Sequence, residues 1–321
     1  MRIPFDQLEK EFLRVLEGLG FSRSKAAHCA RIFAQNSLDG VYSHGLNRFP
    51  AFVRSVEEGL VRIDSEPGAV RRMGNLECWD GNLAPGMYTA SQAMARAIEL
   101  AVAEGIGGVA VRNTNHWMRG GTYGWQAADS GCIAICSSNT IANMPPWGSA
   151  DPRLGNNPLV VAIPREKGAI VLDMAMSQFS YGKLQEYEME GRALPVPGGY
   201  DSSGALSTDP SAIRASRRTL PIGYWKGSGL SLVLDVLVSV LSDGRSVGAI
   251  TATGKESGLS QIFLCLDASR ADQGLIENII TFTKSGENVM YPGEKTLATR
   301  QRNEREGIPV NENAWKALLA M

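Results

Sequence analysis

The sequence predicts an α+β protein in which a mixed β-sheet is joined to a helical layer built from both ends of the chain. Apolar residues recur at helical spacing over 5–38 and again over 297–321, whereas short apolar runs typical of strands lie between residues 67 and 172. These strands do not alternate strictly with helices, which favours a mixed sheet over a doubly wound parallel one.

Length and composition fit this architecture. The chain has 321 residues, of which 44% are hydrophobic and 20% charged, with a net charge of −1. At roughly 150 residues per domain, this length predicts two domains. Because chain ends often lie close together, we assign residues 1–70 with 285–321 to a helical domain and residues 71–284 to a mixed-sheet domain. The near-neutral charge argues against nucleic acid as a partner.

The helical layer begins with two helices within 5–38, which the segment Gly18-Leu19-Gly20 separates. A third helix is predicted over 48–58, with Pro50 in its first turn and Gly59 at its end. A helix over 88–104 lies between the first two predicted strands. The predicted strands cover residues 76–79, 109–111, 133–136, 159–163, 170–172 and 261–266.

Two further segments have distinctive compositions. Residues 183–222 are rich in proline and glycine and predict a long functional loop. An apolar helix is predicted to start just after Gly229. Its most apolar part, 230–241, is about 12 residues long and contains Asp235, so it is shorter than the ~20 residues that span a bilayer. We therefore expect no membrane anchor.

The cysteines are scattered, odd in number and never spaced as CxxC, so the sequence predicts neither a disulfide framework nor a zinc site. This usage is typical of a reducing cytoplasm, and the N-terminus lacks the apolar segment of a secretory signal. We therefore expect a cytoplasmic protein. The cysteines are Cys29, Cys78, Cys132, Cys136 and Cys265.

Only three histidines are available for acid–base chemistry near neutral pH. His28 lies in an alanine-rich helix and is interpreted as structural. His44 is followed four residues later by Arg48, and the two share one face if that stretch is helical. An imidazolium can protonate a carbonyl oxygen while a guanidinium binds the adjacent carboxylate, so the pair suits a 2-oxo acid. A surface turn with a solvated arginine explains the spacing equally well.

Neither standard phosphate-binding signature is present, because no GxGxxG follows a strand and no GxxxxGK[ST] occurs. The best anion site is the glycine-rich segment 223–229, which is predicted to open the apolar helix and contains Lys226. His116 lies in a polar, glycine-rich loop directly after a strand, as binding residues often do.

The residues leave other classes of function open. His44, His116 and Asp173 together could ligate a metal, although no HxxxH-like spacing supports this. A metal- or histidine-dependent lyase or hydrolase would need no dinucleotide. A non-catalytic protein that binds a sugar acid would consume no cofactor, and the clustering of His44, Arg48 and His116 between glycines argues against that alternative.

Several long segments resemble the malate/L-lactate dehydrogenase family that is not Rossmann-based, and within it the branch that reduces 2,3-diketo-L-gulonate. The resemblance runs over nearly the whole chain, thins after about residue 250, and implies a non-Rossmann NAD(P)-binding domain. The segments that carry it are Val41-Tyr42-Ser43-His44-Gly45 with Asn47-Arg48-Phe49-Pro50, Asn115-His116-Trp117-Met118-Arg119-Gly120-Gly121, Tyr123-Gly124-Trp125-Gln126-Ala127-Ala128, Met144-Pro145-Pro146-Trp147-Gly148 and Gly223-Tyr224-Trp225-Lys226-Gly227-Ser228-Gly229.

The resemblance assigns roles residue by residue. It implies that His44 is the proton donor, with Ser43, Arg48, Asn115 and His116 around the substrate. It implies cofactor contacts from a strand, a helix start and a late turn, comprising Ala169, Ile170, Val171, Leu172, Asp173, Met174, Ala175, Trp225, Lys226, Gly293, Glu294 and Lys295.

One position departs from the branch, because Glu294 stands where a histidine is expected. A carboxylate disfavours a nearby 2′-phosphate, so we expect NADH to be preferred over NADPH. The resemblance also implies a homodimer with its active site near the interface.

The predicted activity is therefore the NAD(P)H-dependent reduction of a 2-oxo or 2,3-dioxo sugar acid, namely 2,3-diketo-L-gulonate to 3-dehydro-L-gulonate. A His/Arg pair would serve other substrates too. The alternatives are other 2-oxo acids of the malate, lactate or ureidoglycolate type, or a cyclic imino acid.

Overall fold

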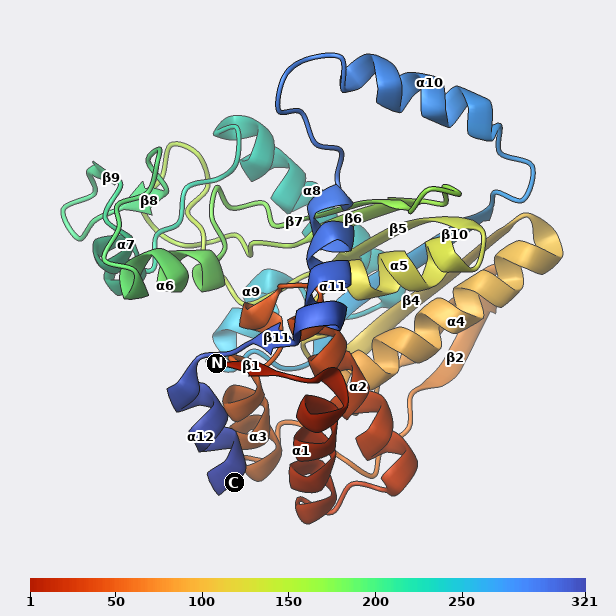
Figure 1. Cartoon of the computed structure of the whole chain (residues 1–321), viewed down its shortest axis with the longest axis horizontal. Coiled ribbons are helices and arrows are strands. Elements are labelled where there is room, and N and C mark those ends of the chain that lie inside the picture. Colours follow the sequence, from red (N-terminus) through yellow and green to blue (C-terminus); the bar gives the residue numbers. More distant parts are fainter.

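A computed structural model describes residues 1–321 and contains a central seven-stranded mixed sheet (Figure 1). Only β3 and β4 run parallel, and every other neighbouring pair is antiparallel, which confirms the mixed sheet. The six predicted strands are all present, and the edge strand β2 is an addition. In spatial order the strands are β2 (Gly68–Met73), β3 (Leu76–Asp80), β4 (Ile106–Thr114), β10 (Leu259–Asp267), β5 (Cys132–Ser138), β6 (Leu159–Ile163) and β7 (Ile170–Met174).

The two faces of this sheet are covered by different helices. On one face, α4 (Gly86–Glu104) and α5 (Gly121–Asp129) bury a core of 21 residues that includes Val109, Val111 and Phe263. These positions alternate along their strands, as the pleat requires. On the other face, α8 (Trp225–Ser242) packs through Leu234 and Val238. The helix α4 connects β3 to β4 and so accounts for the single parallel pair.

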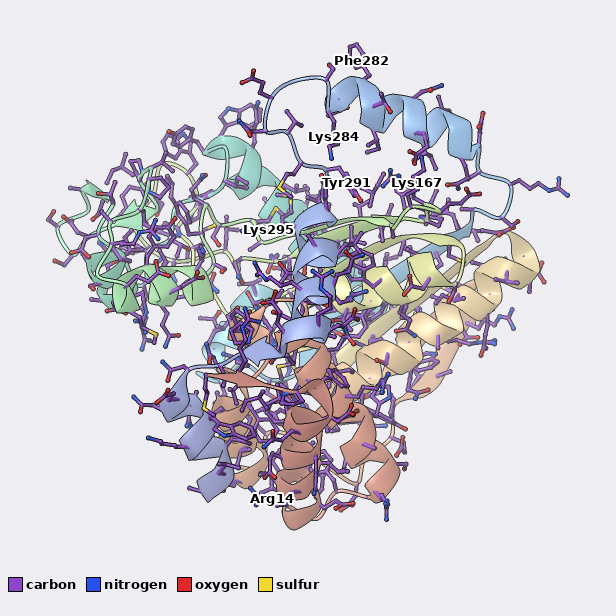
Figure 2. The ribbon with its side chains drawn as sticks, viewed as in Figure 1. Arg14, Lys167, Phe282, Lys284, Tyr291 and Lys295 are labelled. Atoms are coloured by element: carbon purple, nitrogen blue, oxygen red, sulfur yellow. The ribbon has the colours of Figure 1, made fainter.

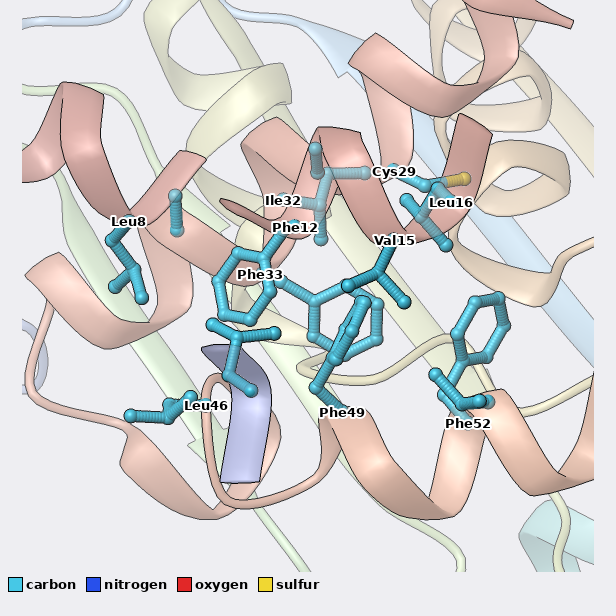
Figure 3. Packing of buried hydrophobic residues seen from close by; sticks show 14 of the residues in the cluster. Leu8, Phe12, Val15, Leu16, Cys29, Ile32, Phe33, Leu46, Phe49 and Phe52 are labelled. Atoms are coloured by element: carbon cyan, nitrogen blue, oxygen red, sulfur yellow. The ribbon is translucent and has the colours of Figure 1, made fainter. Parts of the chain in front are cut away.

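The helical layer combines the two ends of the chain, with the termini close together in Figure 1. It contains α1 (Phe5–Gly18), α2 (Arg23–Leu38), α3 (Phe49–Glu57) and α12 (Glu312–Ala320), while β1 (Arg2–Ile3) pairs with β11 (Ile308–Pro309). Its separate core of 23 buried residues centres on Phe12, Phe33 and Phe49, whose rings pack together (Figure 3). Ile308, Trp315 and Leu318 from the C-terminal end belong to the same core.

The expectation of a structureless loop over 183–222 is wrong. This region contains α6 (Tyr181–Met189), α7 (Pro210–Ser216) and a hairpin of β8 (Gly199–Tyr200) and β9 (Leu206–Ser207). Ser180 and Asp209 cap the two helices with their side chains. Leu184, Leu194 and Ile213 form a small core between them. Apolar residues so widely spaced give no periodic signal.

The helix α8 begins at Trp225, five residues earlier than expected. Gly227 lies inside this helix and does not form a loop. A Cβ at this position would come 2.3 Å from the Ile222 carbonyl oxygen, so glycine is needed for the close packing. Its 18 residues are long and apolar enough to span a membrane. However, its Asp235 accepts hydrogen bonds from Asn139 and from the backbone of Val247, at the start of α9 (Val247–Ala252), which fixes α8 to the sheet domain.

The last two helices before α12 differ in their packing. The helix α10 (Gln273–Thr283) has no buried residue and projects from the body at the top of Figure 1. The helix α11 (Glu294–Glu306) lies against both α2 and α5, where the Arg300 guanidinium stands 4.8 Å from the centre of the Trp125 ring. Thus α11 connects the helical layer to the sheet domain.

Candidate functional site

The candidate site lies at one end of the sheet, where several strand ends meet. Because β4, β5 and β7 run opposite to β10 and β6, the ends of the first three lie beside the starts of the other two. His116 follows β4 here. His44 comes from the helical layer, in the single 3-10 turn Tyr42–His44. The two imidazole rings stack with their centres 5.9 Å apart and 12° between their planes.

The backbone around His44 is held in place by neighbouring elements. Asn36 of α2 donates a hydrogen bond of 3.0 Å to the His44 carbonyl oxygen and accepts one from Thr122 of α5. A Cβ at Gly45 would come 2.1 Å from Ser37 Oγ, so only glycine allows the turn to lie this close to α2. No sequence pattern indicates Asn36, because a lone asparagine within a helix has no distinguishing signature.

Hydrogen bonds to Nδ1 define the chemistry of both rings. The Met118 backbone N–H donates to His116 Nδ1 at 3.0 Å, so a neutral His116 carries its proton on Nε2. Ser43 Oγ lies 3.0 Å from His44 Nδ1. When the hydroxyl donates, His44 also carries its proton on Nε2. Ser43, His44 and His116, which the resemblance assigned to the substrate site, thus lie together in the structure.

Both imidazoles are strongly perturbed. Burial, reinforced by the charges of Arg48 and Arg119, lowers the pKa of His44 to about 4. Burial, Arg48 and His44 lower the pKa of His116 well below its usual value. Both rings are therefore neutral at pH 7 in the free chain. Strongly shifted groups that converge in a cleft are typical of active sites.

Arg48 stands beside the histidines, although not for the reason that the spacing suggested. The turn at His44 ends at Gly45 and α3 begins only at Phe49, so His44 and Arg48 do not share one helix face. Instead Arg48 and His116 line the same cavity of about 160 Å³. Arg48 Nη2 lies 3.7 Å from Glu256 Oε2, and the guanidinium remains partly exposed.

Asn115 also belongs to the wall of this cavity, but its amide is largely engaged by the protein. Its Nδ2 donates to the carbonyl oxygens of Leu83 and Ala84, at 2.8 and 3.1 Å, and its Oδ1 accepts from Ser257 at 3.0 Å. These bonds fix the loop that carries His116. Direct contact between Asn115 and a substrate stays a prediction.

A buried ionic network that the sequence did not reveal lies behind the site. Asp39, at the end of α2, accepts hydrogen bonds from Arg119 and from Arg300 Nε, the latter at 2.7 Å. Arg119 Nε also lies 3.7 Å from Asp173 Oδ2, which accepts a 2.8 Å bond from the Gly121 N–H. The network joins the helical layer, the His116 loop, β7 and α11. Its members lie too far apart in the sequence for any spacing rule to connect them.

The segments expected to contact a cofactor gather along β7, which is an edge strand. Gly293 sits against its start, since a Cβ there would come 3.0 Å from the Val171 nitrogen, and the Val171 N–H donates to the Pro292 carbonyl oxygen. Just past its end, the Ile222 N–H donates to the Met176 carbonyl oxygen, which brings the start of α8, with Trp225 and Lys226, to the same edge.

This edge suits an extended dinucleotide. Because Val171 points its N–H outward, the two-residue period points the N–H of Asp173 outward as well. The first residues of α8 lie at one end of the edge, where a helix N-terminus favours a phosphate group, whereas α11 begins at the other end with the carboxylate of Glu294. Ala169 and Val171 are buried, whereas Ile170, Leu172 and Met174 are partly exposed. Since the Val171 N–H is bonded to Pro292, the donors that fit such a group are the outward N–H of Asp173 and the start of α8.

Glu294 and Lys295 begin α11 next to a second cavity, of about 530 Å³. The Glu294 carboxylate accepts from Lys284 and, at 3.1 Å, from the Tyr291 N–H. The hydrogen bond from Lys284 lowers the pKa of Glu294, so it is ionised. Figure 2 shows Lys284 and Tyr291 on the inner side of α10 toward Lys167, and Phe282 pointing outward.

Metal ligation by His44, His116 and Asp173 finds no support in their arrangement. Nowhere in the chain do three or more His, Cys, Asp or Glu side chains form a potential metal-binding group. Asp173 instead faces Arg119, and its pKa is raised by burial.

Comparisons with known proteins identify the family of the chain. Residues 3–319 match the family profile described as Malate/L-lactate dehydrogenase. The chain is 45% identical to the 2,3-diketo-L-gulonate reductase of Citrobacter koseri and 44% identical to that of Escherichia coli O139:H28, with all of both chains covered in each case.

Solved structures agree on the fold. Malate dehydrogenase from Entamoeba histolytica has a TM-score of 0.92 at 23% identity, covering 100% of this chain and 96% of that one. Malate dehydrogenase from Pyrococcus horikoshii OT3 has a TM-score of 0.89 at 26% identity, covering 100% and 94%. From the family match and the full-length identities, we conclude that the chain belongs to the malate/L-lactate dehydrogenase family.

Proposed function

We propose that this chain is an NADH-dependent reductase that converts 2,3-diketo-L-gulonate to 3-dehydro-L-gulonate. Membership of the family makes it an oxidoreductase with a nicotinamide cofactor. The observation that carries the proposal is the stacked pair His44 and His116, with His116 and Arg48 in the wall of one cavity. The full-length likeness to curated diketogulonate reductases supports the choice of substrate.

The reaction adds a hydride to the keto carbon and a proton to its oxygen. Residues 169–175, 225–226 and 293–295 would hold the reduced nicotinamide, which would supply the hydride when bound. His44, as the imidazolium that forms when the substrate binds, supplies the proton from Nε2, and Ser43 at Nδ1 keeps the ring oriented. His116, which also carries its proton on Nε2, donates a hydrogen bond to the substrate. Arg48 binds the carboxylate.

The test follows the loss of absorbance at 340 nm with purified protein and NADH or NADPH. The acceptors are 2,3-diketo-L-gulonate, pyruvate, oxaloacetate and a cyclic imino acid. Fast oxidation of NADH with the diketo acid, and slow oxidation with the others, supports the proposal. Faster turnover of another acid would keep the family chemistry and discard this substrate.

Arg48→Lys is expected to raise KM and lower kcat together, reducing kcat/KM by on the order of 10²-fold. Lysine keeps the charge but loses the planar fork that binds a carboxylate through two hydrogen bonds. The substrate then binds more weakly and less precisely. Steady-state kinetics measures both constants, and Arg54→Lys, on an exposed position of α3, is the matched control. An unchanged KM would remove Arg48 from the site.

Glu294→Gln is expected to shift the preference between NADPH and NADH by about tenfold toward NADPH, which corresponds to ~1.4 kcal/mol. The substitution removes a carboxylate that would repel a 2′-phosphate and frees Lys284 to attract it. Initial rates with the two cofactors give the ratio of their kcat/KM values. The exposed Glu287→Gln serves as the control, and an unchanged ratio would show that Glu294 does not face the ribose.

We also propose a cytoplasmic homodimer in which α8 forms the contact. The outer face of this helix exposes Leu232, Val233, Val236 and Val240, which are 54–68% exposed. A continuous apolar surface of this kind is typical of an interface. The double substitution of Val236 and Val240 by glutamate is expected to give a monomer in light scattering. Val102→Glu, on the similarly exposed surface of α4, is expected to change nothing.

A further inference from the structure

The cavity beside His116 has room for more than the reacting groups of a small 2-oxo acid. Its volume is about 160 Å³, and a cavity of ~150 Å³ holds a ligand of the size of benzene, with six non-hydrogen atoms. His116, in its wall, stacks on His44 at 5.9 Å. A ketone bound at His44 is therefore separated from this cavity only by the imidazole ring of His116.

The lining of the cavity is mixed in a way that suits a hydroxylated carbon chain. Phe52, Val61 and Met118 supply apolar surface for the carbon atoms. Ser55 donates its own hydroxyl proton to the Ala51 carbonyl oxygen at 2.9 Å, so its oxygen remains free to accept. Pockets of mostly apolar character with a few placed polar groups are typical of small-molecule sites.

Glu256 is the only carboxylate in this lining. The neighbouring Lys255 also lines the cavity, but its Nζ lies 3.7 Å from Glu58 Oε2, outside the cavity. Glu256 Oε2 lies 3.7 Å from Arg48 Nη2, and the Glu256 side chain is only 27% exposed. An ionised carboxylate is an acceptor only, so the ligand groups that suit it are hydroxyl donors and not a second anion.

From this arrangement we propose that Glu256 determines specificity by binding the hydroxyl groups of a polyol tail in the cavity beside His116. The proposal rests on the proposed function, because it places the carboxylate of the substrate on Arg48 and its ketone at His44. In 2,3-diketo-L-gulonate the three carbons beyond the second ketone each carry a hydroxyl. These six non-hydrogen atoms match the size of the cavity.

The test measures binding, so that it does not depend on turnover. L-Gulonate carries the tail and L-lactate does not, and calorimetry gives Kd for each. The wild-type chain is expected to bind L-gulonate at least tenfold more tightly than L-lactate. Glu256→Ala is expected to lose this preference by weakening L-gulonate alone, while L-lactate binds equally well or more tightly because Arg48 has lost a competing carboxylate.

Two controls separate specificity from a structural effect. Glu256→Asp is expected to recover part of the preference, and Glu57→Gln, on an exposed position of α3 outside the cavity, to leave it unchanged. Equal binding of the two acids by the wild-type chain, equal weakening of both in Glu256→Ala, or a preference that survives in that variant would each overturn the proposal. Failure of the 340 nm assay would instead overturn the proposed substrate.

Discussion

Replacing His44 by alanine is expected to lower kcat for ketone reduction by about 10²- to 10⁴-fold, the range that general acid catalysis contributes. The cofactor edge along β7 is built without His44, so the Kd for NADH should stay the same. Stopped-flow measurement of hydride transfer and fluorescence titration of NADH test the two halves of this prediction. A wild-type kcat in His44→Ala would discard the mechanism.

The pH dependence follows from the charges around His44. Burial, with Arg48 and Arg119, holds its pKa at about 4 in the free chain, so the ring is neutral at pH 7 and must gain a proton to act as an acid. The negative charge of a substrate carboxylate bound to Arg48 offsets the positive charge of that guanidinium, which raises the pKa of His44. We therefore expect proton uptake on substrate binding, and a kcat/KM for reduction that falls as the pH rises.

Calorimetry in two buffers with different ionisation enthalpies measures this uptake. Wild-type protein and the control His28→Gln, whose histidine lies on α2 against Tyr88, should take up the same fraction of a proton. His44→Ala should take up less. Equal uptake in all three would place the titrating group elsewhere.

The success of the sequence prediction depended on how local each feature is. The predicted strands and the helix before β4 follow from periodic apolar residues, and the structure contains them. Ser43, His44 and His116 could be predicted as neighbours because each lies in a compact motif, and the structure brings them together. The failures are non-local: α6 and α7 share a core made by residues that are far apart in sequence, and Gly227 packs on Ile222 instead of opening a loop.

The same reason explains why Asp39 was missed, although it joins α2 to the His116 loop and to α11. It lies after α2, and its partners Arg119 and Arg300 are distant in sequence. A buried carboxylate between two guanidinium groups has no signature along the chain. Only the fold shows that the helical layer is attached to the catalytic end of the sheet through this residue.

Asp39→Asn is expected to destabilise the protein by about 3–5 kcal/mol, because it leaves two guanidinium groups without their carboxylate in a buried place. The Asp39 side chain is only 2% exposed and that of Arg119 only 6%. Denaturant unfolding measures the loss. Asp151→Asn, which breaks an exposed pair with Arg153, should cost no more than about 1 kcal/mol.

The pH dependence of the stability difference between wild type and Asp39→Asn tests whether the Asp39 charge causes it. Burial would raise the pKa of Asp39, but hydrogen bonds and charges from Arg300 and Arg119 outweigh it and leave the pKa lowered. A lowered pKa gives stability that is fully present above the unfolded value of about 3.9 and is lost as the pH falls through the folded value. The gap between wild type and Asp39→Asn should therefore be constant from pH 5 to 8, as an order-of-magnitude window, and shrink in acid.

The catalytic consequence follows from the same contacts. Arg119 is held between Asp39 and Asp173, and its loop carries His116. Loss of Asp39 should thus lower kcat as well as stability, even at temperatures where the variant is fully folded. A variant that lost stability while keeping wild-type kcat would show that the network holds the layers together without positioning the site.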